Sequence, residues 1–288
     1  MSLWLTLAVN SISFGGLLFL LSAGFSLIFG LMRIPNLMHG SFFMLGAYFG
    51  VTFLRPPFNF NFFVAALASA AAIAIIGGAI ERLLLRRLAG QELAQVLLTL
   101  GFSFIIADIC LMVWTGDPIQ PTTPSGLQGA VRVFNIFFPI YRLVIVAIAV
   151  AIAIALWLMI DLTRLGAMIR AGVDDAPIAR VVGIKVSQLF TLIFCLGAAL
   201  AAFAGVMGAP ILSAYPGLDT DMLPLALIVV ILGGTGSLLG ALVGSFVIGF
   251  LYNFGQVMFP DLAYVILFLP MLLVLVLRPQ GLFGRMTS

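Results

Sequence analysis

The chain has 288 residues, of which 63% are hydrophobic and only 8% are charged. A soluble domain carries charge on roughly a quarter of its residues, so this composition excludes an ordinary soluble protein. The formal net charge of +3 is too small a basic surplus to indicate a nucleic-acid-binding surface.

Long apolar runs recur along the chain and indicate its fold class. A helix needs about 20 apolar residues to cross a hydrocarbon core about 30 Å thick. A membrane β-barrel would instead alternate apolar and polar residues, whereas segments 143–160 and 262–277 are apolar on every face. The sequence therefore predicts an all-α, polytopic membrane helix bundle with eight or nine transmembrane segments, some of them broken or re-entrant. In chain order, the predicted spans cover residues 4–31, 36–54, 60–80, 93–115, 140–160, 187–211, 222–233, 238–256 and 262–277.

The first predicted span has no basic residue ahead of it and is longer than the apolar centre of a signal peptide, so we expect a retained helix. The second span begins beside Pro35 with a cluster of polar and small residues. A proline that interrupts helical hydrogen bonding next to polar side chains is typical of substrate contacts in transporters. The cluster is therefore a candidate substrate path, although its polar groups could equally satisfy backbone carbonyls of a neighbouring helix. Its members are Asn36, His39, Gly40 and Ser41.

Ionisable residues within the predicted spans are scarce, with His39 near the second span and Asp108 in the fourth. Carriers driven by protons or sodium usually hold several embedded acids, so this scarcity argues against ion coupling. The sequence also contains no G-x-x-x-x-G-K-[ST] phosphate-binding loop, so ATP-driven transport would need an ATPase in a partner chain. We assign Asp108 no role. Cys110 and Cys195 lie in apolar runs and are interpreted as buried free thiols, because no spacing indicates a disulfide framework or a metal site.

The charged segment 161–186 separates the fifth and sixth predicted spans. Asp175 can cap a short helix, Pro177 is tolerated in a first helical turn, and Gly183 suits the position just past a helix end. These signals predict a helix over 176–182. A short capped helix between two spans suits the transfer of force from a soluble motor, and an ordinary linker with solvated charges is the alternative.

Small residues repeat every four positions in the later spans, a spacing that lets helix backbones approach closely where lipid supplies no hydrophobic driving force. The segment 233–245 (GGTGSLLGALVGS) also loosely mimics a nucleotide-binding glycine loop, but no strand–helix–strand pattern surrounds it. Just before it, the predicted span 222–233 is too short to cross alone and is expected to be broken or re-entrant. The predicted packing residues are Gly197, Ala201, Gly205, Gly236, Gly240 and Gly244.

Arginine and lysine in the connections predict the orientation. Threading the spans places three charged segments on one side, which then holds ten of the thirteen basic residues. That side is predicted to be cytoplasmic, which puts the N-terminus outside and the C-terminus inside. The proline-rich segment 117–142 becomes the longest external connection. The basic residues assigned to the cytoplasmic side lie in segments 81–92 and 161–185, at Arg33, and in the tail at Arg278 and Arg285.

Four separated motifs resemble a known family. NLMHGSFFMLGAY (36–48) resembles the N-x-x-H-G-x-x-[FY]-M-[LI]-G-[AS]-Y signature of the permease subunits of branched-chain amino acid ABC importers. RAGVDDAPIARVVGI (170–184), GGTGSLLGALVGS and the terminal LVLRPQGLFGR (275–285) are similar to the same family and follow in the same order. The chain length is similar to that of the shorter of two paralogous permeases in this family.

The resemblance implies a single transmembrane permease domain over residues 1–288 with no catalytic residue, no metal and no cofactor of its own. Such permeases pair as two membrane subunits and dock two cytoplasmic ATPases, which hold the ATP and Mg. They accept substrate from an extracytoplasmic binding protein. The resemblance also implies a multi-pass location in the cell (inner) membrane of a bacterium or archaeon.

The resemblance further implies that segment 161–186 is the coupling element that contacts the ATPases. ABC importer permeases often carry E-A-A-x-x-x-G there, and Ala179 and Gly183 match its second alanine and its glycine. Pro177 and Ile178 replace the first two residues, which leaves the partner contacts around Pro177 undefined. The implied coupling residues are Arg170, Asp174, Asp175, Ala179, Arg180, Gly183 and Ile184.

The sequence leaves the substrate open, because family members also carry urea, amides and aromatic acids. It also leaves open whether the permease pairs with itself or with a paralogue. An autonomous secondary carrier or channel for a small solute is the alternative function. A membrane-embedded enzyme such as a lipid-modifying transferase would need clustered acids lining a cavity, and the adjacent pair Asp174–Asp175 lies in a loop without a second cluster.

Overall fold

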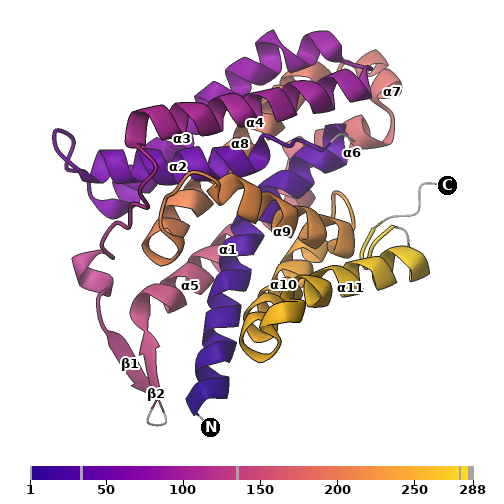
Figure 1. The fold of residues 1–288 in the computed structure, drawn as a ribbon. Helices are drawn as coiled ribbons and strands as arrows, with labels where there is room; N and C mark the ends of the chain where they lie inside the picture. Colours follow the sequence, from indigo (N-terminus) through magenta and orange to yellow (C-terminus); the bar gives the residue numbers. More distant parts are fainter. Residues whose placement is uncertain (1, 33–34, 134–135, 279, 285–288) are drawn as a thin grey trace.

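The computed structural model describes residues 2–32, 35–133, 136–278 and 280–284. Within these residues the fold is a bundle of α-helices with one short antiparallel hairpin (Figure 1). The helices that correspond to predicted spans are α1 (Ser2–Met32), α2 (His39–Leu54), α3 (Phe62–Leu83), α4 (Glu92–Trp114), α5 (Ile140–Leu162), α8 (Val186–Leu212), α9 (Leu218–Gly233), α10 (Leu238–Met258) and α11 (Ala263–Leu277). The connecting elements are the 3-10 turns η1 (Leu85–Leu88), η2 (Ser125–Leu127) and η3 (Pro260–Leu262), the strands β1 (Ala130–Val133) and β2 (Ile136–Pro139), and the helices α6 (Arg164–Asp174) and α7 (Ala176–Val181).

The helices fall into two length classes. Among the described residues, seven helical segments are long and apolar enough to cross a membrane. Helices α2 and α9 have 16 residues each, whereas the 15 residues of α11 continue η3 in one 18-residue segment. At 1.5 Å per residue α2 and α9 each extend about 24 Å, which is less than the ~30 Å hydrocarbon core. The all-α, polytopic bundle is therefore confirmed, with α2 and α9 as its short elements.

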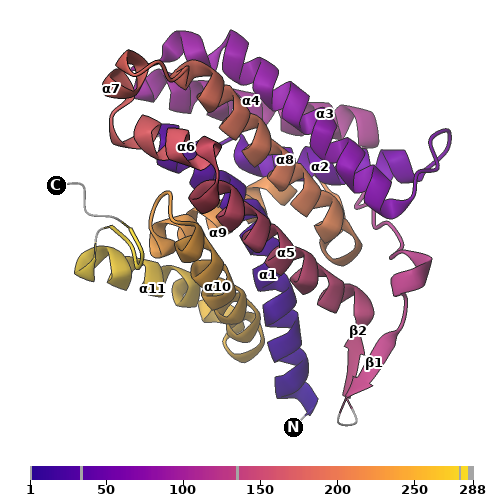
Figure 2. The same ribbon diagram turned by 180° about the vertical axis from the view of Figure 1, so that it is seen from behind.

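The core of the bundle is formed by α1, α2 and α8. Helix α8 packs against α1, α2 and α3, and α1 packs along α10 on another side (Figure 2). Helices α1 and α2 are apolar nearly all round. A helix of this kind is buried on most of its faces. Helices α4, α5 and α11 lie at the periphery and expose large apolar side chains, as expected of surfaces that meet lipid or another subunit.

The predicted small residues of α8 mark backbone contacts. An added Cβ at Gly197 would lie 2.8 Å from the Gly24 carbonyl oxygen of α1, and one at Gly205 would lie 2.0 Å from the Phe43 carbonyl oxygen of α2. Ala201 between them is completely buried. No side chain larger than hydrogen fits the two glycine positions without separating the helices, which is the kind of close approach that small residues allow.

The second glycine row is only partly helical. Gly240 and Gly244 lie on α10 and pack against α9, where a Cβ at Gly240 would lie 2.0 Å from the Gly233 carbonyl oxygen. Gly236 instead lies in the turn before α10 with a φ of +75°. Its four-residue spacing from Gly240 therefore does not reflect one helix face. Gly236 does pack closely, against Gly30 of α1.

The charged segments gather at one end of the bundle. Figure 1 shows α6 and α7 beside the α3–α4 connection, far from the β1–β2 hairpin and the start of α1. The tail joins the end of α9, because the Leu282 N–H donates to the Leu232 carbonyl oxygen at 2.9 Å. This grouping agrees with the charge pattern used to orient the chain. Arg33 and Arg285 lie outside the described residues.

The connection 117–142 contains structure that composition did not reveal. Strands β1 and β2 pair in antiparallel register, with Val131 opposite Phe138. Ile119 and Ala214 exchange two backbone hydrogen bonds of 2.8 Å, which ties this connection to the loop after α8. Strands of four residues are too short to show a period in the sequence, so only tertiary contacts define them.

Candidate functional site

Helix α6 turns back tightly against the end of α5. Thr163 caps it, because its Oγ1 accepts the Gly166 N–H at 3.3 Å. A Cβ added at Gly166 would lie 1.8 Å from the Ile160 carbonyl oxygen of α5. Arg170 donates to the same carbonyl, and its Nη1 lies 3.6 Å from Asp161 Oδ1. The predicted coupling residue Arg170 thus anchors α6 to α5.

Helix α7 begins with the predicted cap. Asp175 Oδ1 accepts the Ile178 N–H at 2.9 Å, and Pro177 lies in the first turn, where its missing N–H is not needed. The helix over 176–182 predicted from these signals is confirmed as α7. The Asp174 side chain lies outside the described part of the structure.

Helix α7 ends in a Schellman motif, in which two backbone bonds close the last turn. The Gly183 N–H donates to the Arg180 carbonyl oxygen and the Ile184 N–H to the Ala179 carbonyl oxygen, both at 3.0 Å. Gly183 has a φ of +92°, which L-residues with side chains rarely adopt. Four predicted coupling residues, Ala179, Arg180, Gly183 and Ile184, therefore form the cap that ends α7 just before α8.

Replacing the α7 N-cap tests this local structure. In Asp175→Ala the Ile178 N–H loses its acceptor, which costs about 1 kcal/mol, so its amide hydrogen exchange is expected to accelerate about fivefold. Asp175→Asn keeps an equally good capping oxygen and is expected to exchange like the original protein. Equal exchange rates in all three proteins would show that the cap does not stabilise α7.

Helix α7 presents an apolar face at the charged end of the bundle. Ile178, Val181 and Val182 are 62%, 88% and 75% exposed, whereas Ala179 is buried against the body of the protein. Arg180 is exposed beside them. A contiguous group of exposed apolar side chains next to charged ones makes α7 a candidate protein-interaction surface.

A second polar site lies where the first turns of α2 and α9 meet. A Cβ at Gly40 would lie 2.7 Å from the Asp219 carbonyl oxygen, so the two turns are in direct contact. Ser41 Oγ donates to Asp219 Oδ2 at 3.0 Å and lies 3.1 Å from Ser103 Oγ near the middle of α4. Asp219 is buried, and its Oδ1 has no hydrogen-bond partner among the described residues. Ser41 therefore joins three helices at the junction of two short ones.

The two remaining candidate side chains behave differently. His39 is fully buried, and its Nε2 lies 3.0 Å from the Leu21 carbonyl oxygen, which makes Nε2 the donor. This contact fits the alternative in which His39 satisfies a neighbouring helix. Asn36 is buried without a partner for either side-chain atom among the described residues. It lines a cavity of about 10 Å³ together with Gln95 and Thr99, room for about one water.

Two buried acids were missed by the sequence analysis. Glu81 and Asp219 lie within α3 and α9, beyond the apolar windows 60–80 and 222–233. Helices extend past their apolar segments when polar groups find partners, so hydropathy alone placed both acids in connections. The count of ionisable groups within spans was therefore too low. Asp108, in contrast, occupies an exposed position on α4.

The thiols and possible metal ligands add no further site. Cys110 is buried as predicted, Cys195 is half-buried, and both are free. Among the described residues, His, Cys, Asp and Glu form no group of three that could hold a metal ion. The fold and these two sites define a multi-pass membrane protein. Helix α7 is exposed at one end of the bundle, and the short helices α2 and α9 meet at their first turns.

Comparison with protein-family models identifies the family of this membrane protein. Residues 7–275 match the family described as branched-chain amino acid transport system, permease component. Because the match covers most of the chain, the protein belongs to this family, and the resemblance carried by the four motifs is confirmed.

Individual relatives agree with this assignment. The high-affinity branched-chain amino acid transport system permease protein BraD of Pseudomonas aeruginosa is 28% identical over 96% of this chain and 94% of its own length. The corresponding protein LivH of Escherichia coli K12 is 25% identical over the same shares. The ribose import permease protein RbsC of Escherichia coli K12 is 28% identical over 66% of this chain and 59% of its own length. No solved structure matches. The predicted class, a membrane permease subunit, is thus confirmed.

Proposed function

We propose that this chain forms half of the translocation pore of an ATP-driven ABC importer for branched-chain amino acids or a related small polar solute. A second permease subunit, identical or paralogous, completes the pore. Two partner ATPases bind at the α6–α7 end and hydrolyse ATP with Mg, and an extracytoplasmic protein delivers substrate at the hairpin end. The complex lies in the cell (inner) membrane of a bacterium or archaeon, with the N-terminus outside and the C-terminus in the cytoplasm.

The observation that carries this proposal is the exposed apolar face of α7. It belongs to a helix capped at both ends, at the end of the bundle where the basic residues gather, in a chain of a transport permease family. Basic residues favour the cytoplasmic side, where the ATPases are. Because only Lys185 separates the α7 cap from α8, movement of α7 is expected to displace this core helix.

We place the substrate path at the junction of α2 and α9. Short helices that end inside a membrane protein leave backbone and side-chain polar groups available at depth, and such breaks line substrate paths in transporters. Asn36, Gly40 and Ser41 contribute to this path, and Asp219 joins them through Ser41. His39 holds the start of α2 against α1 through its hydrogen bond to the Leu21 carbonyl oxygen.

Reconstitution separates this function from that of an autonomous carrier. Proteoliposomes that contain the chain with its second permease, ATPases and binding protein are expected to accumulate substrate only with ATP. The chain alone is expected to give no flux. ATP-independent flux through the chain alone would identify a carrier or channel and contradict the proposal.

Removing the charge of Asp219 tests the substrate path. Asp219→Asn retains the volume and an acceptor for Ser41, yet it is expected to lower the uptake rate about tenfold, because a carboxylate held at membrane depth is costly and usually functional. Asp117→Asn, in the exposed connection after α4, is the matched control and is expected to transport normally. Unchanged uptake by Asp219→Asn would remove Asp219 from the path.

A further inference from the structure

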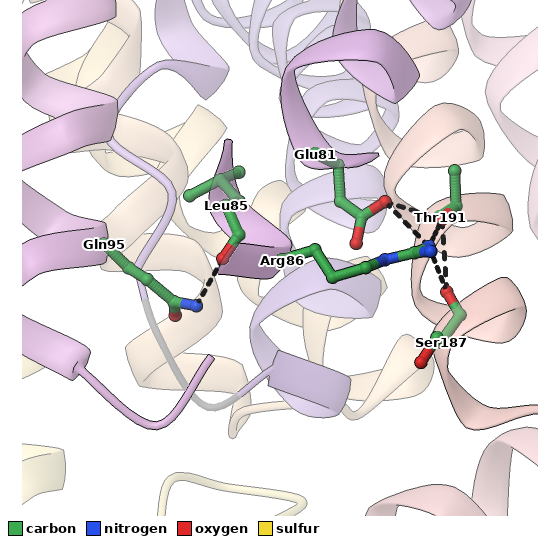
Figure 3. A network of polar contacts seen from close by, with 6 residues as sticks. All are labelled: Glu81, Leu85, Arg86, Gln95, Ser187 and Thr191. Atoms are coloured by element: carbon green, nitrogen blue, oxygen red, sulfur yellow. Dashed lines mark hydrogen bonds and ion pairs between the residues drawn. The ribbon is translucent and has the colours of Figure 1, made fainter. Parts of the chain in front are cut away.

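An ion pair between a buried carboxylate and a partly exposed guanidinium lies at the charged end of the bundle, outside the two sites described above. Glu81, in the last turn of α3, is 1% exposed. Its Oε2 accepts a 2.6 Å hydrogen bond from Thr191 Oγ1 of α8 and lies 3.5 Å from Arg86 Nη2 of η1 (Figure 3). A carboxylate is costly to bury unless it is both paired and hydrogen-bonded, and Glu81 meets both conditions.

Arg86 closes this cluster and extends it along α8. Its Nη2 donates to Thr191 Oγ1 and, at 2.8 Å, to the Ser187 carbonyl oxygen. Ser187 and Thr191 occupy the first two turns of α8. We call Glu81, Arg86 and Thr191 the α3–α8 joint. It fixes the end of α3 to the part of α8 that follows the α7 cap.

The joint also contacts the segment before α2 through η1. The Leu85 carbonyl oxygen, next to Arg86, accepts a 3.0 Å hydrogen bond from Gln95 Nε2 (Figure 3). Leu85 and Gln95 line the same small cavity as Asn36. Thr99, one turn further along α4, accepts the Leu37 N–H through its Oγ1 at 3.3 Å. Contacts therefore run without a gap from α8 through η1 and α4 to the residues that precede α2.

Stability alone does not account for an ion pair at this position. Such a pair contributes little net stability compared with apolar groups of the same volume, because the buried Glu81 carboxylate loses its hydration. Helices α3 and α8 already pack closely at Gly77 and Gly78, where an added Cβ would lie 3.0 Å from Ala198 Cβ and 2.4 Å from Cys195 Sγ. The charged side chains add directional hydrogen bonds that fix the position of α3 and η1 relative to α8.

We propose that Glu81 and Arg86 are positioning residues of the transport cycle. They transmit the displacement of α7 and α8 to Asn36 and Leu37, the residues just before α2. This inference rests on the proposed function, because it takes α7 as the ATPase-binding element. The joint converts a movement of α8 into a movement of η1 and Gln95, and hence of the small cavity that Asn36 lines. Substrate contact and ATP hydrolysis are then linked through this joint.

The test measures ATP hydrolysis and uptake in the same proteoliposomes, with the complete complex. Arg86→Gln is expected to lower the substrate taken up per ATP about tenfold, in the range of typical coupling energies, while hydrolysis continues. Arg87→Gln is the matched control: it removes the same charge from the neighbouring, exposed residue of η1. Its uptake per ATP is expected to equal that of the unmodified complex.

A double variant guards against simple misfolding. Arg86→Gln alone leaves the Glu81 carboxylate buried without its cation, so Glu81→Gln/Arg86→Gln removes both charges and is expected to restore thermal stability. The double variant is still expected to show low uptake per ATP, because the directional bonds of Arg86 remain absent. A stable double variant with normal uptake per ATP would contradict the proposed role of the α3–α8 joint in coupling. Absence of ATP-dependent uptake in the unmodified complex would instead contradict the proposed function itself.

Discussion

Gly183→Val is expected to abolish most ATP-driven uptake while the permease still inserts and assembles. Apart from its chain neighbours, no described atom lies within 4 Å of a Cβ added at Gly183, so steric bulk is not the reason. The reason is the φ of +92°, which a β-branched residue adopts only at a cost of about 1–2 kcal/mol. The cap between α7 and α8 would relax, and uptake per ATP is expected to fall about tenfold.

The control for this variant is Gly129→Val. Gly129 has a φ of +120° and its added Cβ would make only an ordinary contact, 3.9 Å from Ile140 Cδ1. It lies beside the β1–β2 hairpin, at the opposite end of the bundle from α7. The same backbone strain there is expected to leave uptake per ATP unchanged. Equal uptake by both variants would show that the α7 cap does not transmit force.

Gly205→Ala is expected to destabilise the whole bundle. The single added methyl group would lie 2.0 Å from the Phe43 carbonyl oxygen and 3.0 Å from the Ala47 backbone nitrogen. These are backbone atoms, which cannot rotate away, so α2 and α8 would have to separate. The expected cost is about 3 kcal/mol, or roughly 10 °C in the Tm of the protein in detergent.

Gly101→Ala makes the same chemical change at an uncrowded position. Gly101 lies within α4, and a Cβ there would have no described atom within 4 Å outside its chain neighbours and the surrounding backbone of its own helix. Alanine is the better helix former by about 1 kcal/mol, so this variant is expected to match or exceed the original Tm. If Gly205→Ala and Gly101→Ala denatured at the same temperature, the close approach of α2 and α8 would not limit stability.

Local signals predicted the α7 region closely. Asp175, Pro177 and Gly183 act within a few residues of one another, so their caps can be read without knowledge of the tertiary fold. Apolar run length likewise predicted the long spans, because a membrane crossing depends on length and hydropathy alone. Gly197 and Gly205 followed from their spacing, since both lie on one helix and on one face.

The polar junction depended on contacts that sequence order does not show. Ser41 and Asp219 are 178 positions apart, yet they share a hydrogen bond of 3.0 Å. Glu81 meets Thr191 across 110 positions. A buried acid and a surface acid have the same side chain, and only the partners supplied by other helices distinguish them.

The position of the ATPases tests the central claim most directly. A photo-crosslinking amino acid at Val181, which is 88% exposed on α7, is expected to attach to a partner ATPase in the assembled complex. The same amino acid at Val131, exposed on β1 at the opposite end, is expected to give no ATPase adduct. ATPase adducts from Val131 and none from Val181 would place the motor at the wrong end and contradict the coupling role of α7.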